Sequence, residues 1–452
     1  MAVEKSNNDL NTTRALLQQL LNLAIPIFIG GAVQAGYQLI NSFWVGRLGT
    51  AAVAVISVCM PINLLLISFG SGLSLAGSIL TAQSHGARNH RQVERIAAQT
   101  FLAMSSFALM LSVAGYFLSP DILRLMRVSD EIFVDATHYL RVSFLGQLFL
   151  FAGAMYQAIL RGIGESKAPL RIVVTGVIIN AALDPLFIYG LGPLPAFGVG
   201  GAAYATLITQ IVTAVAGVGL MLRPRFGLRF TVDALIPDWK LITQIFRLGF
   251  PVSIEQSMQA LTVTLITIFA AKFGTLTLAS YGLAFRVITF LIIYSFSISM
   301  AISILVGQSI GARNLEKVTR VTRVGTIFNF CSMALVGAVI FFLAEHVISF
   351  FVPHDASLIA HGATALRIFS LSFAFTAAQL ALGGAFRGAG ATFSAMVLTL
   401  FGAWAIQVPA AYVLSHFTSL GELGLWWATP IAAVVNAGVA ALLFKSQRWM
   451  RI

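Results

Sequence analysis

Two acidic residues lie inside long apolar stretches of this sequence, where a charge is costly to keep. The chain has 452 residues, and of its sixteen acidic side chains only Asp184 and Glu255 fall well within such stretches. A carboxylate retained in a lipid bilayer usually faces a cavity or a partner and binds protons, metal cations or cationic ligands. Asp184 and Glu255 are therefore the candidate cation-coupling residues.

Polar side chains are expected beside Asp184. Asn180 precedes it by four residues and so shares its face of a helix. Gln34, Tyr37 and Asn41 belong to the first apolar stretch, and Asn41 lies about 9 Å from its outer end, at a depth comparable with that of Asp184. These residues predict a polar pocket for a substrate or a cation. The alternative interpretation is that Asp184 hydrogen-bonds the backbone perturbed by the proline that follows it.

Glu255 has a candidate partner of opposite charge. Arg286, on the next predicted helix, lies at the same depth as Glu255, about 12 Å from the inner face. A pairing of the two side chains is expected. Two interpretations of that pair stay open: a static bridge that pins two helices, or a bridge for which Na⁺, H⁺ or a cationic substrate competes.

Helices that span a membrane must position these side chains. Hydrophobic residues make up 58% of the chain and charged residues only 10%, against about 25% charged in soluble domains. The apolar runs are near the roughly 20 residues that a helix needs to cross, and they do not alternate as barrel strands do. We predict an all-α integral membrane fold of twelve transmembrane helices. Their approximate centres are Phe28, Leu66, Phe107, Phe149, Ile178, Val212, Thr262, Phe290, Leu335, Leu371, Leu400 and Ala432.

The basic residues predict the orientation of these spans. With the N-terminus inside, twenty-one Lys and Arg residues fall in inner segments, Arg387 among them, and four fall in outer loops. Basic loops resist translocation, so both termini are predicted to be cytoplasmic. The net charge of +12 is thus a topology signal. No basic surface with interleaved aromatics indicates a nucleic-acid partner.

An internal duplication organises the chain into two halves. QSHGARN at residues 83–89 returns as QSIGARN 225 positions later, and Pro26 is matched by Pro251 at the same spacing. After a one-residue slip, RGIG at Arg161 matches RGAG at Arg387. Six spans in each half give both halves the same orientation, which predicts two six-helix lobes related by pseudo-twofold symmetry. The predicted boundaries are 1–222 for the N-terminal lobe, 223–240 for a cytoplasmic linker and 241–452 for the C-terminal lobe.

The duplicated loop is itself interpretable. Each copy is expected to end an inner helix, with the glycine in the left-handed conformation of a helix stop and the arginine near the carbonyl-rich end. It is either a turn that fixes topology or a moving gate. The repeated residues are Gln83, Gly86 and Arg88 in the first copy and Gln308, Gly311 and Arg313 in the second.

Several ordered motifs resemble the multidrug and toxic compound extrusion (MATE) family of secondary transporters. They are YQLINSFWVGRLGT at 37–50, AQSHGARN, YLRV, RGIGESKAP, NAALDPLFIYGLGP at 180–193, GFPVSIEQ at 249–256 and GQSIGARN, and they cover essentially the whole chain. The resemblance implies a twelve-helix transporter that exports cationic or amphipathic compounds in exchange for Na⁺ or H⁺. Asn41 stands where many members place an aspartate, so a coupling carboxylate that the family often uses is absent here.

A cation-coupled antiporter that works by alternating access is the predicted function, and a flippase for a lipid-linked saccharide is the alternative. Motifs of intramembrane enzymes such as HExxH and GxSxG are absent from the sequence, so no catalysis is expected. Neither the seven histidines nor the two cysteines have metal-ligand spacing. We expect no cofactor besides the coupling H⁺ or Na⁺. The expected partners are small organic substrates and the lipid bilayer, for a monomer in the prokaryotic plasma (inner) membrane.

Overall fold

The computed structural model describes residues 2–190, 195–223, 226, 232–447 and 449, and this part of the chain is helical with no β-strand. The first half contains α1 (Ala2–Gly46), α2 (Thr50–Gly86), α3 (His90–Leu125), α4 (Asp130–Gly162), α5 (Lys167–Tyr189), α6 (Val199–Met221) and the short 3₁₀ helix η2 (Val232–Leu235). The second half contains α7 (Trp239–Lys272), α8 (Thr275–Gly311), α9 (Leu315–Phe351), α10 (Ala356–Ser370), α11 (Phe373–Gly388), α12 (Thr392–Leu400), the π-helix η3 (Phe401–Gln407), α13 (Val408–His416) and α14 (Glu422–Ser446).

The predicted number of spans agrees with the structure. Within the described residues, eleven helices are long and apolar enough to cross a membrane, and the bent pair of α10 and α11 brings the total to twelve. The two helices of this pair meet at 45°. Leu371, the predicted centre of the tenth span, falls in the break between them. The all-α, multi-pass membrane fold is thus confirmed, with one span broken at its middle.

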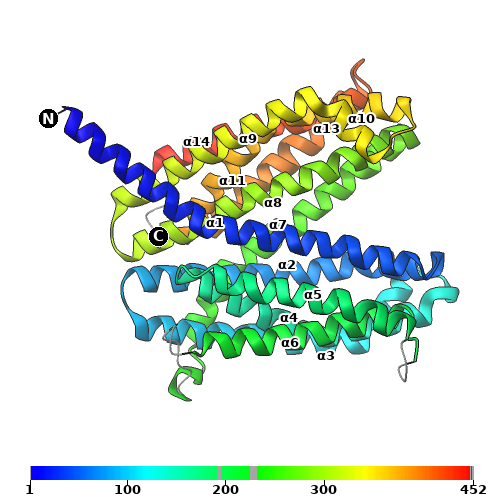
Figure 1. The fold of residues 1–452 in the computed structure, drawn as a ribbon, viewed down its shortest axis with the longest axis horizontal. Coiled ribbons are helices and arrows are strands. Elements are labelled where there is room, and N and C mark those ends of the chain that lie inside the picture. The colour runs from blue at the N-terminus through cyan, green and yellow to red at the C-terminus, as the bar shows by residue number, and fades with distance from the viewer. Residues whose placement is uncertain (1, 191–194, 224–225, 227–231, 448, 450–452) are drawn as a thin grey trace. The chain divides into compact units, whose positions relative to one another are not determined.

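One compact unit of the chain runs from Pro26 to Ser253, and we call it the N-lobe. Figure 1 shows its helices α2 to α6 lying side by side in one bundle. α4 packs against α2, α3 and α6, and α5 packs against α6. The core of this lobe includes the fully buried side chains of Phe151, Met155 and Tyr156 on α4. α4 is therefore the central helix that orders its neighbours around it.

The other compact unit comprises the residues up to Ile25 and those from Ile254 onward, and we call it the C-lobe. Its helix α11 packs against α8, α9 and α14, and α10 packs against α8 and α9 (Figure 1). Tyr281, Phe369 and Trp426 form an aromatic cluster in its core, with ring centroids 5.6–6.3 Å apart. α11 takes the central place here that α4 takes in the N-lobe.

Two helices are divided between the lobes at residues that the duplication relates. The division in α1 lies between Ile25 and Pro26, and that in α7 lies two residues after Pro251. A proline removes one helical hydrogen bond and favours a bend, so these are natural points for a helix to leave one bundle. The boundaries predicted from the sequence remain predictions, and residues 224–225 and 227–231 of the predicted linker lie outside the described residues.

The described end of the linker is fastened to α3. The Nε2 group of Gln99, which is fully buried, donates hydrogen bonds to the carbonyl oxygens of Ala234 and Ile236, both at 2.8 Å. The Oε1 atom of the same side chain accepts from the backbone N–H of Asp238 at 2.9 Å, and Arg95 pairs with the Asp238 carboxylate at 2.9 Å. One glutamine therefore satisfies three backbone groups of an irregular segment that would otherwise be buried without partners.

Candidate functional site

A polar pocket lies inside the N-lobe. It has a volume of about 180 Å³, and helices α1, α4, α5 and α6 contribute its walls. Gln34 and Tyr37 of α1 and Asn180 of α5 line it. The hydroxyl group of Tyr37 lies 3.5 Å from that of Thr206 on α6. The structure therefore brings together three of the residues that the sequence analysis assigns to one pocket.

Asp184 is completely buried on α5, one helical turn from this pocket's Asn180. The amide Nδ2 of Asn180 donates to the carboxylate Oδ1 at 3.5 Å. The other oxygen, Oδ2, is buried and has no hydrogen-bond donor in the described part of the chain. The backbone hydrogen bond required by the alternative interpretation of Asp184 is likewise not found there. A buried carboxylate oxygen without a donor is costly, and a proton or a cation at that oxygen would remove much of the cost.

Asn41 lies on α1 and is half-buried, but it does not line the pocket. Its carbonyl oxygen Oδ1 is buried and accepts no hydrogen bond from any described residue. An amide at this position carries no charge. The negative charge of this part of the N-lobe therefore comes from Asp184.

Glu255 is the centre of a buried polar cluster in the C-lobe. The guanidinium of Arg387 donates from Nη1 to Oε1 at 2.9 Å and to Oε2 at 3.3 Å. Thr399 Oγ1 donates to the same Oε1 at 2.9 Å, and Arg387 Nη2 donates to Ser299 Oγ at 3.2 Å. Only 5% of Glu255 and 6% of Arg387 are exposed. The cluster joins α7, α8, α11 and α12, and every charge in it has a partner.

The predicted pairing of Glu255 with Arg286 is wrong. Arg286 is exposed on α8 and makes no ion pair with any described residue. The depth along the helix was estimated from the rise per residue, but depth does not fix the direction in which a side chain points around the helix axis. Two residues at one level can therefore face away from each other.

Arg387, one of the basic residues that the sequence analysis assigns to inner segments, is the partner of Glu255 instead. This arginine lies in the last turn of α11, and its buried side chain points back into the C-lobe. The side chain passes Gly383, one turn earlier, where a Cβ atom would lie in van der Waals contact with the guanidinium, 3.4 Å from Nη2. The sequence signal that could have revealed Arg387 was the match of RGIG with RGAG. An arginine at matched positions of both halves can have a structural role besides fixing the orientation of the helices. Nothing in the sequence singled out Thr399 or Ser299.

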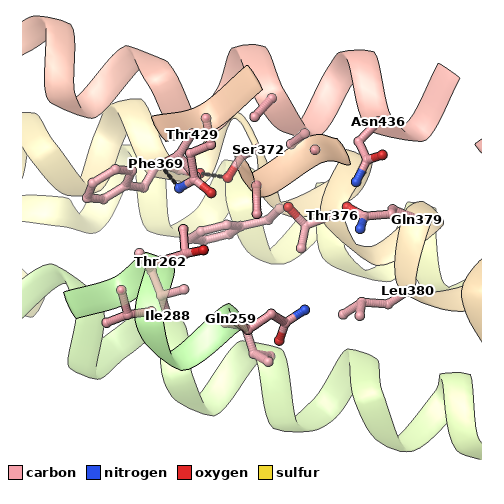
Figure 2. A pocket seen from close by; sticks show the side chains of 18 of the residues that line it. Gln259, Thr262, Ile288, Phe369, Ser372, Thr376, Gln379, Leu380, Thr429 and Asn436 are labelled. Carbon is pink, nitrogen blue, oxygen red and sulfur yellow. Dashed lines mark hydrogen bonds between the residues drawn. The ribbon is translucent and has the colours of Figure 1, made fainter. Parts of the chain in front are cut away.

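A second pocket, of about 240 Å³, opens beside this cluster in the C-lobe. Thr399 belongs both to its wall and to the Glu255 cluster. Figure 2 shows the amide side chains of Gln259, Gln379 and Asn436 directed into the same space from α7, α11 and α14. The sequence analysis did not predict this pocket, because common amide and hydroxyl residues spread over five helices leave no local pattern.

The duplicated loop ends α2 and α8 in the same way. In both copies the glycine, Gly86 or Gly311, is the last helical residue, and the residue with positive φ is the arginine, Arg88 at 57° or Arg313 at 55°. The left-handed position was expected at the glycine, so this expectation is wrong. The following asparagine, Asn89 or Asn314, accepts a hydrogen bond from the third residue after it and so caps the next helix. Gln83 and Gln308 lie in the last turn of the first helix.

Comparison with known proteins identifies the family. The family model MatE matches residues 26–186 and 251–413, so the two matched stretches begin 225 residues apart and at the two matched prolines. The chain belongs to the MATE family. The duplication is thus the MATE duplication, and this MATE chain is a multi-pass membrane protein of a transporter family.

Curated relatives and solved structures agree with this assignment. The chain is 31% identical over 417 residues to the probable multidrug resistance protein YoeA of Bacillus subtilis, covering 91% of this chain and 90% of YoeA. It is 27% identical over 441 residues to the probable multidrug resistance protein NorM of Thermotoga maritima, covering 96% and 93%. The crystal structure of MATE in complex with MaL6 matches with a TM-score of 0.88 at 26% identity, covering 95% of each chain. The MATE likeness therefore extends over the whole length of the chain.

Proposed function

We propose that this protein is an antiporter that exports cationic or amphipathic organic compounds across the prokaryotic inner membrane in exchange for H⁺ or Na⁺. The solute enters from the cytoplasm, the binding cavity is exposed alternately to the two sides, and cation entry resets it. Both termini are cytoplasmic in this proposal. Its support is membership of the MATE family and the printed names of YoeA and NorM as probable multidrug resistance proteins.

The observation that carries the proposal is the surroundings of Asp184. Its carboxylate is fully buried, has one amide contact at 3.5 Å and leaves Oδ2 without a donor. An ionised group in this state is unstable in a membrane interior, so it binds a proton or a metal cation, or it attracts a cationic solute. The three ligands compete for one negative charge. Such competition is what an exchanger needs, because the solute leaves when the driving cation arrives.

The neighbours of Asp184 have supporting roles in this proposal. Gln34, Tyr37 and Asn180 offer amide and hydroxyl groups to a solute in the adjoining pocket. Asn41 keeps a polar oxygen at the position where a carboxylate would add a second charge. We therefore expect the N-lobe to take up one cation through Asp184.

Glu255 is the second proposed coupling residue, and it takes part only when a ligand displaces Arg387. Its two oxygens already accept three hydrogen bonds from Arg387 and Thr399. A cation that binds there has to break a buried ion pair, which is strongly unfavourable unless the arginine finds another partner. We assign the coupling first to Asp184.

A flippase for lipid-linked saccharides is not favoured. Such a cavity has to neutralise a pyrophosphate, for which bidentate arginines are the usual donors. The residues that line the N-lobe pocket and the C-lobe pocket include no lysine and no arginine.

The test is efflux of ethidium from proteoliposomes under an imposed Na⁺ or pH gradient. Asp184→Asn should reduce gradient-driven efflux to the rate of protein-free liposomes, whereas Asp135→Asn, an exposed aspartate of α4, should transport like the wild type. If Glu255→Gln alone stops the gradient-driven flux, coupling lies in the C-lobe. If no gradient drives any cationic dye, the exporter proposal is wrong.

A further inference from the structure

We propose that the C-lobe pocket is a binding site for uncharged, flat aromatic solutes that both donate and accept hydrogen bonds. The inference deepens the proposed export function and rests on it, because it names a second substrate class beside the cationic one. The pocket lies wholly within the C-lobe, and its volume of about 240 Å³ is close to the lower end of the range of roughly 300–1,000 Å³ for small-molecule sites.

The lining of this pocket is polar but uncharged. Its residues include Gln259, Gln379, Gln407 and Asn436 with their amide groups, and six threonine or serine hydroxyls lie among apolar and aromatic side chains such as those of Phe369 and Phe373. No Asp, Glu, Lys, Arg or His side chain is part of the wall. Amides and hydroxyls bind a neutral solute through directed hydrogen bonds, but they give a cation no counter-charge.

The nearest carboxylate does not give the pocket a net negative charge. Thr399 links the wall to Glu255, and Arg387 holds both oxygens of that carboxylate at 2.9 and 3.3 Å. The ion pair has no net charge, and both members are more than nine-tenths buried. A cationic solute in this pocket would therefore have to displace Arg387, whereas a neutral solute leaves the pair intact.

One buried polar atom of the wall has no hydrogen-bond partner in the described part of the chain. Asn436 is 3% exposed, and its carbonyl Oδ1 accepts no hydrogen bond from any described residue. Its side chain is directed into the pocket (Figure 2). A buried acceptor without a donor is destabilising in a folded protein, so a solute that donates an N–H or O–H group there removes that cost. This acceptor makes a donor group on the solute part of the inference.

The backbone beside Asn436 is also irregular. The π-helix η3 interrupts the span between α12 and α13, and its residues Gly402, Ala403 and Gln407 line the pocket. A π-helical turn widens the helix and occurs frequently at functional sites. Gly402 lies against the Asn436 amide, where a Cβ atom would collide with Nδ2. The irregular turn and the unpartnered amide are thus in direct contact.

The experiment measures binding of aminomethylcoumarin, a neutral, flat, fluorescent aromatic amine, to the purified full-length protein by fluorescence anisotropy. Asn436→Leu and Gln379→Leu should each weaken binding about 10-fold, because each removes hydrogen-bonding groups from the wall. Ala403→Phe, which fills the space, should abolish binding. Gln256→Leu is the matched control, because it removes an amide of α7 that does not line the pocket, and its Kd should equal that of the wild type.

The outcomes separate this inference from the export proposal, because binding is measured without any gradient. Ethidium should not displace aminomethylcoumarin, and Asp184→Asn should bind the coumarin with unchanged affinity even where it no longer exports ethidium. The inference is overturned if the coumarin does not bind, if ethidium displaces it, or if Ala403→Phe, Asn436→Leu and Gln379→Leu all bind as the wild type does. A uniform melting temperature across the variants excludes misfolding as the cause of lost binding.

Discussion

The N-lobe and the C-lobe each bury one carboxylate and each contain one arginine of a duplicated motif, but they arrange these residues differently. In the C-lobe, Arg387 reaches Glu255 at 2.9 Å. In the N-lobe, Arg161 donates to Gln157 at 2.7 Å and leaves its Nε without a partner in the described residues, while Asp184 keeps a free Oδ2. The C-lobe has therefore neutralised its carboxylate internally. The N-lobe has kept an acid whose charge is available to a ligand.

This difference follows from where each acid stands in the duplicated sequence. Glu255 lies four residues after Pro251, and the residue at the corresponding position of the first half is Gly30. Asp184, in turn, lies near the end of α5, the third helix after the duplicated loop. The two arginines occupy matched positions of the halves, whereas Glu255 corresponds to a glycine in the first half. A duplicated scaffold can thus hold a structural ion pair in one half and an exchangeable charge in the other.

Breaking the ion pair should have the largest effect on stability. Arg387→Leu leaves Glu255 buried with only the Thr399 hydroxyl as a donor, so we expect a loss of about 3–5 kcal/mol. The double variant Glu255→Leu with Arg387→Leu should recover most of that loss, because two apolar residues replace two charges. Thermal unfolding of the purified variants in detergent measures both. If the single and double variants lose equal stability, Arg387 stabilises the protein through packing and not through its pairing with Glu255.

Removing the N-lobe acid should have the opposite effect and raise the stability of the folded protein. Asp184→Leu deletes a buried carboxylate whose Oδ2 has no donor, so we expect a gain of about 1–3 kcal/mol in Na⁺-free buffer. The matched control is Asp135→Leu, at an exposed site where little change is expected. A lower melting temperature for Asp184→Leu would mean that this carboxylate has a stabilising partner in the folded protein.

The same measurement identifies the coupling ion. A ligand that binds only the folded state raises the melting temperature, and the rise grows with the ratio of its free concentration to its Kd. If Na⁺ occupies Asp184, adding NaCl in place of choline chloride stabilises the wild type and leaves Asp184→Leu unchanged. If the two salts are equivalent for the wild type, the proton is the coupling ion.

The features that the sequence predicted are those set along a single helix. Apolar runs gave the spans, and the four-residue spacing of Asn180 and Asp184 placed both on one face of α5, where their side chains do meet. Gln34 and Tyr37, which are three residues apart on one face of α1 and were grouped with these residues, both line the N-lobe pocket. These properties depend on the helix geometry alone, so one sequence is enough to read them.

Features set between helices were not predicted. The partner of Glu255 depends on which helices pack against α7 and on the rotation of each helix about its own axis. Neither can be inferred from the residues of one helix alone. The C-lobe pocket is a stronger example, since Gln259 and Asn436 are 177 positions apart and acquire a common function only when α7 and α14 pack around one space. The break at Leu371 was not predicted for a different reason, because the two flanking serines, Ser370 and Ser372, are a weak signal inside an otherwise apolar run.

Arg286→Leu should have the smallest effect and sharpens the contrast within the C-lobe. Arg286 lies at the estimated depth of Glu255, yet it is exposed on α8 while Arg387 is buried in the ion pair. We expect a change within about 0.5 kcal/mol, because an exposed arginine without a partner loses little when replaced. Thermal unfolding of Arg286→Leu beside Arg387→Leu is the measurement. A loss as large as that of Arg387→Leu would mean that both arginines share Glu255 in the folded protein, and the carboxylate would then exchange partners as an exchanging site does.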